Sequence, residues 1–205
     1  MFDTIYQWLV PLVLLAVAVT AVLFAAFTGF AEGLIRVVDA INEGIGRAVS
    51  WLTLGTVVVC FVVVALRYGF NTGWVWMQDI YVWFHAAVFM LGAGYTLKAG
   101  GHVRVDLIYA RLSDRRRAWV DIFGSFVLMT PYLVVMGASS LPFTLSSWSI
   151  LEHSLQPDGL PGFFIIKSVL VLYVLLLAIQ ALALLARSVL VLRGLTSYAP
   201  AAMSH

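Results

Sequence analysis

Long, uninterrupted runs of apolar residues dominate this chain and predict helices that span a membrane. Each run reaches the roughly 20 residues that a helix needs to cross a bilayer. The runs cover approximately residues 8–31, 48–70, 74–97, 118–141 and 163–186. Membrane-spanning strands would instead alternate apolar and polar residues. The pattern therefore predicts an all-α fold, a polytopic helix bundle in the membrane.

The first run is interpreted as a retained span and not as a cleaved signal peptide. A signal peptide begins with positive charge and has a shorter apolar core. Residues 1–7 contain Asp3 and neither Lys nor Arg. A long interfacial helix is the alternative interpretation of this run.

The segment between the first two runs carries charges at a helical spacing. The charged residues are Glu32, Arg36, Asp39, Glu43 and Arg47. At 3.6 residues per turn they form one stripe, and apolar residues cover the opposite face. This predicts an amphipathic arm helix over residues 32–47, which lies on the membrane surface or braces a partner.

Composition and charge support a membrane protein and exclude several other classes. Hydrophobic residues make up 62% of the chain and charged residues 11%, whereas a soluble domain has about 25% charged residues. The net charge of +2 is too small to indicate nucleic-acid binding. The single cysteine, Cys60, can form no internal disulfide. The chain shows neither a Walker motif nor metal-ligand spacing, so we expect no enzyme activity, metal or cofactor.

The distribution of Lys and Arg predicts the orientation in the membrane. The segment before the second span holds two, the loop after the third span six and the tail two, all on one side. Basic loops face the cytoplasm. We therefore expect a periplasmic N-terminus and a cytoplasmic C-terminus.

Two ionisable side chains flank the predicted hairpin at residues 71–73. Arg67 and Asp79 each lie six residues from Gly73, so they share a depth on adjacent helices. An ion pair would offset the cost of burying both charges. An ion or proton site and separate snorkelling to the surface are the alternatives.

Three further residues interrupt the apolar runs. His85 lies near the middle of the third span, as a satisfied interior or interface histidine or as a haem ligand or proton relay. Asp121 lies one turn into the fourth span and can pair with Arg187 or Lys98. Pro131 predicts a kink, because it lacks the N–H of a helical residue.

Short motifs at the ends of the spans carry a family resemblance. They are the run GHVRVD at residues 101–106, RYGF at 67–70 followed by WMQD at 76–79, and GLP at 159–161. Together these motifs resemble the small (Q-type) membrane subunit of tripartite ATP-independent periplasmic (TRAP) transporters. The short outer loop is most similar to the branch labelled mannitol/chloroaromatic.

The resemblance implies a four-span small-permease core over residues 48–193, preceded by the arm helix at 32–47. Residues 1–31 then form an extra N-terminal span, and residues 194–205 form a cytoplasmic tail. In such systems the small subunit stabilises a large, sodium-coupled M-type subunit in the bacterial inner membrane. A periplasmic binding protein delivers an organic acid to that subunit. The implied partners are therefore these two proteins and membrane lipids, with no catalytic, substrate-binding or metal residue in this chain.

Two groups of residues are the candidate sites that the resemblance implies. The loop signature is interpreted as a tight turn with an interfacial helix or as a contact between subunits, and it comprises Gly101, His102, Arg104 and Asp106. The candidate contact with the binding protein comprises Trp148, Glu152, His153 and Asp158. The family's acidic pair is Gln78–Asp79 here, so one acid remains.

Two other functions compete with this interpretation. A haem- or quinone-linked membrane anchor of a redox complex needs a second axial histidine at the depth of His85, and the other histidines lie in loops or the tail. An autonomous exporter needs a binding acid near mid-depth, whereas Asp79 lies near the outer boundary.

Overall fold

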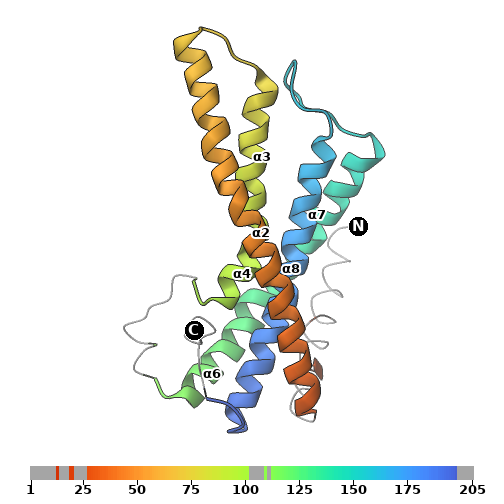
Figure 1. Cartoon of the computed structure of the whole chain (residues 1–205). Helices are drawn as coiled ribbons and strands as arrows, with labels where there is room; N and C mark the ends of the chain where they lie inside the picture. Colours follow the sequence, from red (N-terminus) through yellow and green to blue (C-terminus); the bar gives the residue numbers. More distant parts are fainter. Residues whose placement is uncertain (1–12, 14–18, 21–26, 102–108, 110–111, 198–205) are drawn as a thin grey trace. The chain divides into compact units, whose positions relative to one another are not determined.

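A computed structural model describes residues 13, 19–20, 27–101, 109 and 112–197 of the chain (Figure 1). The elements in this part are all helical, which confirms the all-α prediction. They are α2 (Thr28–Gly69), α3 (Val75–Leu91), α4 (Ala93–Lys98), α6 (Asp114–Gly124), the π-helical turn η1 (Ser125–Met129), α7 (Thr130–Ser149) and α8 (Phe163–Leu192).

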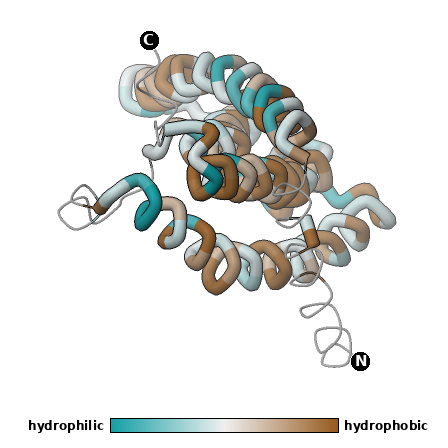
Figure 2. The backbone as a smooth tube through the Cα atoms, turned by 90° about the horizontal axis from the view of Figure 1, so that it is seen from below, coloured by the Kyte–Doolittle hydropathy of each residue, from teal (hydrophilic) through white to brown (hydrophobic). Residues whose placement is uncertain are grey.

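Four helical stretches in the described residues are long and apolar enough to cross a membrane. They are Thr28–Gly69, Val75–Lys98, Asp114–Ser149 and Phe163–Leu192. These stretches match the second to fifth predicted spans to within one residue at the hairpin between residues 69 and 75, and Figure 2 shows how apolar residues recur along the helices. The predicted first span, 8–31, lies largely outside the described residues, so the extra span stays a prediction.

The predicted arm helix and the predicted second span lie in one continuous helix. α2 runs for 42 residues from Thr28 to Gly69, with no break near residue 47. Gly44 and Gly46 have weak helix propensity, but a backbone group in an apolar environment keeps its helical bond because no water replaces it. An ion pair between Glu43 and Arg47, one turn apart, stabilises the helix at this point.

The chain folds as two compact units. The first unit comprises residues 1–42, 96–136 and 177–205, and the second comprises residues 43–95 and 137–176. In the first unit, Ala31 of α2 packs with Ala186, Val189 and Leu190 of α8. These small and branched side chains form a buried cluster between the two helices.

Close helix approaches in the second unit depend on glycine. Gly55 of α2 faces the ring of Phe84 on α3, and a Cβ at Gly55 would lie 3.0 Å from that ring. Gly46 of α2 lies even closer to Tyr95 of α4, since a Cβ at Gly46 would be 2.6 Å from the Tyr95 Cβ. The absence of a side chain therefore lets α2 approach the helices that follow it.

A π-helical turn lies directly before Pro131, the residue at which the sequence predicts a kink. The backbone N–H of Thr130 donates to the carbonyl of Ser125, five residues back. The Thr130 hydroxyl donates to the same carbonyl at 2.8 Å. Since Pro131 has no N–H to donate, a wider turn accommodates its ring without ending the span.

Three helices end in the same hydrogen-bonded turn, the Schellman motif. At the end of α4, Gly100 has φ +67° and its neighbour Gly101 donates to the Thr96 carbonyl at 2.9 Å. Gly194 ends α8 in the same way, whereas Leu151 takes the left-handed conformation after α7, with φ +46°. A leucine in this conformation is strained because its Cβ approaches the following carbonyl.

The glycine contact yields a matched pair of stability predictions. Gly46→Ala is expected to lower the free energy of unfolding by about 1–3 kcal/mol, because the new methyl group overlaps Tyr95. A Cβ at Gly44 would have no neighbouring atom within 4 Å. Gly44→Ala is therefore expected to raise the free energy of unfolding by about 0.5–1 kcal/mol through helix propensity. Thermal unfolding of both purified variants in mild detergent measures the difference, and equal shifts would contradict the close approach of α2 and α4.

Candidate functional site

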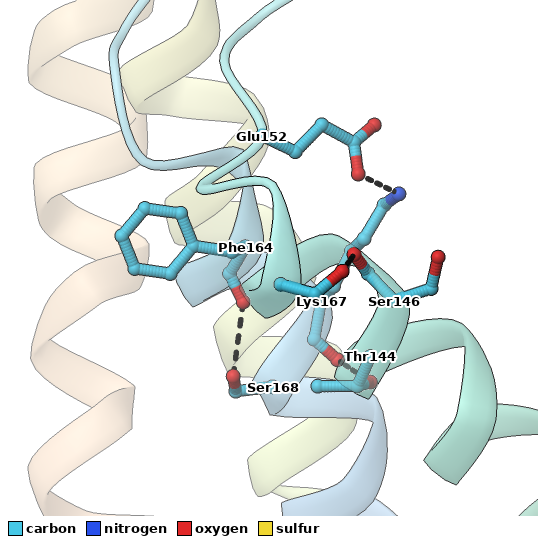
Figure 3. A network of polar contacts seen from close by, with 7 residues as sticks. Thr144, Ser146, Glu152, Phe164, Lys167 and Ser168 are labelled. Carbon is cyan, nitrogen blue, oxygen red and sulfur yellow. Dashed lines mark hydrogen bonds and ion pairs between the residues drawn. The ribbon is translucent and has the colours of Figure 1, made fainter.

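The loop over residues 150–162 connects α7 to α8 and contains three of the four residues predicted to contact a binding protein. Glu152 forms an ion pair with Lys167 of α8, with 2.5 Å between Oε2 and Nζ (Figure 3). The Lys167 ammonium also lies 4.0 Å from the ring centre of Phe143 and 5.5 Å from that of Phe163. Its side chain is 12% exposed. A carboxylate and two aromatic faces therefore stabilise this nearly buried cation.

The ion pair sets the protonation of the loop carboxylate. The hydrogen bond from Lys167 lowers the pKa of Glu152 below its ordinary value of 4.5, and the charge of Lys167 acts in the same direction. Glu152 is therefore ionised at neutral pH, and the pair is intact there.

Hydrogen bonds connect α7 directly to the first turns of α8. The indole N–H of Trp148 donates to the Ser168 hydroxyl at 2.8 Å, and the Trp148 ring meets Phe164 edge-on at 4.5 Å between centroids. The Thr144 hydroxyl donates to the backbone carbonyl of Lys167 at 3.1 Å. Figure 3 shows Thr144, Lys167 and Ser168 lying together beneath Glu152. These contacts fix the base of the loop.

Asp79 of α3 holds the far end of the same loop. Its Oδ2 accepts a hydrogen bond from the backbone N–H of Leu160 at 2.9 Å. A Cβ at Gly159 would lie 2.9 Å from this oxygen and 2.3 Å from the Ser154 hydroxyl. The Gly-Leu-Pro sequence therefore has a steric reason for its glycine, because only a glycine fits beside Asp79.

The structure does not bring Arg67 and Asp79 together as the predicted ion pair. The Arg67 side chain is exposed, and it makes no ion pair with any of the described residues. Equal distances from the hairpin set a common depth, but they do not set the direction in which each side chain points. The carboxylate of Asp79 contacts the backbone N–H of Leu160, whereas the prediction had it contact Arg67.

The four predicted contact residues divide into two kinds. Trp148 and Glu152 belong to the network that holds the loop, although Trp148 stays 47% exposed. His153 and Asp158 are exposed, and Asp158 has φ +61°. The exposed residues His153 and Asp158 therefore lie in a loop whose ends are held in place by side-chain contacts.

A second polar cluster lies in the first unit and joins α2 to α8. The Asn42 amide donates to the Gln180 Oε1 at 2.8 Å, and the Gln180 amide donates to Asp39 at 3.1 Å. Asp39 also forms an ion pair with Arg187. Asn42 and Gln180 are 0% and 1% exposed. Four side chains thus form one hydrogen-bonded chain between helices.

This cluster changes the interpretation of the arm helix. Asp39 belongs to the predicted charged stripe, but it faces α8, while Glu32, Arg36 and Arg47 are exposed. Arg187 pairs with Asp39 and not with Asp121, whose carboxylate accepts from the Tyr109 hydroxyl at 2.9 Å. The single amide Gln180 within the last apolar run was the sequence signal for this cluster.

The remaining predicted residues are the loop signature and His85, for which the structure gives few contacts. Gly101 ends the turn after α4, and His102, Arg104 and Asp106 lie outside the described residues. His85 is exposed on α3. Within the part of the chain that the structure describes, no three His, Cys, Asp or Glu side chains are grouped so that they could hold a metal ion.

Comparison with known proteins adds one finding to this geometry. The sequence model of a family described as tripartite ATP-independent periplasmic transporters, DctQ component, matches residues 56–191, more than half of the chain. No curated protein and no solved structure matches the chain.

The amide pair predicts a recovery in a double variant. Asn42→Leu or Gln180→Leu alone is expected to cost about 1–3 kcal/mol of unfolding free energy, because each leaves a buried polar partner unpaired. The double variant removes both amides and is expected to be more stable than the sum of the single effects predicts, by about 0.6–1.7 kcal/mol. Unfolding of the four proteins in detergent measures this coupling, and strict additivity would contradict the pair.

The Glu152–Lys167 pair predicts a pH dependence. A lowered pKa in the folded state means that the pair stabilises the fold above the ordinary pKa of 4.5 and that this contribution is lost as pH falls through the folded value. Between about pH 6 and about pH 3, the thermal midpoint of the wild type is expected to fall more than that of Glu152→Gln. Asp158→Asn removes an exposed carboxylate from the same loop and is expected to keep the wild-type dependence. Parallel pH profiles for the wild type and Glu152→Gln would rule out this role.

Proposed function

Because the chain belongs to the DctQ family of tripartite ATP-independent periplasmic transporter components, we propose that it is the subunit that stabilises the large membrane subunit of such a transporter. The family match over residues 56–191 carries the proposal. This family is a transporter component and not an enzyme, and its members associate in general with an M-type subunit and a substrate-binding protein. The scaffolding role within that assembly is the part that we propose.

The distribution of polar contacts supports a structural role. The ion pairs of Asp39 and Glu152 and the hydrogen bond of Asp79 all join helices or loops of this chain. Large apolar side chains remain exposed on α2, such as Trp51 and Phe61 at 73% and 71%. Such faces suit a subunit that packs among lipids and other membrane helices.

We further propose that the transporter takes up an organic acid, a carboxylate, in a sodium-coupled step within the large subunit. The motif resemblance supports this, and the same resemblance favours the mannitol/chloroaromatic-like branch. The periplasmic binding protein would select the substrate, so substitutions in this chain are expected to change the amount of working transporter and not its specificity.

The orientation and the docking loop belong to the same proposal. The first unit contains nine of the twelve Lys and Arg residues in its sequence segments, which supports a cytoplasmic position for the basic loops and the C-terminus. The order of spans predicted from the sequence places the loop over residues 150–162 on the periplasmic side, with His153 and Asp158 available to the binding protein. The redox-anchor alternative receives no support from the family match.

Co-purification tests the proposal. A tagged chain is expressed with its neighbouring membrane proteins, solubilised in mild detergent and analysed by mass spectrometry. We expect a large polytopic subunit in near-equal amounts, with an unrelated tagged membrane protein as the control. Recovery of the chain alone, or with a flavin or iron–sulfur subunit, would overturn the proposal.

A further inference from the structure

The candidate span over Val75–Lys98, which contains α3, includes polar side chains such as His85, but little of this chain covers it. Of the four candidate spans, the one over Val75–Lys98 is the least apolar, and 11% of its most apolar stretch is buried. The span of α8 is the most apolar, and 44% of its corresponding stretch is buried. Lipid demands apolar side chains, whereas a protein partner tolerates polar ones. The span that contains α3 is less apolar than the span of α8, although less of it is buried, and this indicates that a neighbour other than lipid contacts α3.

His85 marks the face of α3 that needs such a neighbour. It lies near the middle of the span and is exposed. On the same face, one turn away on either side, Val82 is 53% exposed and Phe89 74% exposed. Within the described part of the chain, the His85 imidazole makes no hydrogen bond. An imidazole facing hydrocarbon would lose its hydrogen bonds to water without replacement.

The exposed face of α2 provides the contrast. Its large exposed side chains in mid-span are apolar, among them Leu54, Val58 and Phe61 at 57%, 52% and 71%. This face can meet lipid tails without leaving a polar group unpaired. The second unit therefore presents one face suited to lipid and one face with a titratable side chain at its centre.

We propose that the α3 face formed by Val82, His85 and Phe89 docks against a membrane-spanning helix of the large subunit. The partner helix supplies a hydrogen-bonding group to the imidazole at mid-depth, either a hydroxyl, a side-chain amide or a free backbone carbonyl. Small side chains beside that group admit the Phe89 ring, because small residues allow close helix contact in membranes. This inference rests on the proposed function and identifies the surface through which the subunit performs it.

Site-specific photo-cross-linking in the intact complex tests the face. A benzophenone side chain replaces Phe89 in one variant and Phe61 in another, since both positions are exposed in mid-span. Irradiation in native membranes is expected to join position 89 to the large subunit and to give no such product from position 61. A product from 61 alone, a product between two copies of this chain from 89, or no protein product from 89 would overturn the inference.

Substitution of His85 tests the hydrogen bond. His85→Leu is expected to lower the recovery of the large subunit with the tagged chain by about three- to tenfold. His85→Gln keeps a hydrogen-bonding side chain and is expected to retain more than half, while Cys60→Leu on the exposed face of α2 is expected to change nothing. Unchanged recovery with His85→Leu would overturn the hydrogen bond.

The wild-type complex separates this inference from the function on which it rests. If the large subunit is absent from the wild-type preparation before irradiation, the proposed function fails. If it is present but position 89 does not cross-link to it, the function stands and the α3 face is wrong.

Discussion

The hydrocarbon core of a bilayer offers no hydrogen-bond partners, and this constraint accounts for most of the polar contacts in the structure. Asn42 and Gln180 are buried, and each meets the other's amide. Lys167 is nearly buried and has a carboxylate and two aromatic rings around its ammonium group. Helix ends at Gly100 and Gly194 fold back on their own carbonyls. These groups take their partners from the chain itself, whereas the mid-span imidazole of His85 finds none among the described residues.

The two units satisfy this constraint in different ways. In the first unit, hydrogen bonds and an ion pair connect Asp39 and Asn42 on α2 with Gln180 and Arg187 on α8, so one turn of α2 is joined to two turns of a helix distant in sequence. In the second unit the polar contacts gather where helices end, and they hold the loop over residues 150–162 through Glu152 and Asp79. The contacts of the first unit determine which helices pair, and those of the second unit fix the conformation of a loop.

The sequence predicted the helices well and their mutual contacts poorly. Apolar runs located the described spans, and α8 begins at Phe163 as predicted. The predicted end at residue 186 fell short, because Arg187 and Ser188 stay helical once they have partners on the same or a neighbouring helix. Periodicity placed Asp39 on a stripe with other charges, but it could not show that Asp39 contacts α8 while Glu32 and Arg36 stay exposed. Asp79 bonds a backbone group 81 residues away, and no local pattern encodes such a partner.

The continuity of α2 bears on how the subunit accommodates its membrane. At 1.5 Å per residue, 42 helical residues extend for about 63 Å, about twice the 30 Å thickness of a hydrocarbon core. The helix has more length than a perpendicular crossing uses, and its charged turns precede its apolar ones without a break. A thicker or thinner bilayer can therefore take up more or fewer turns of the same helix by tilt, with no backbone hydrogen bond lost. A change in bilayer thickness therefore changes which turn of α2 lies at the membrane boundary, while the backbone hydrogen bonds of the helix stay intact.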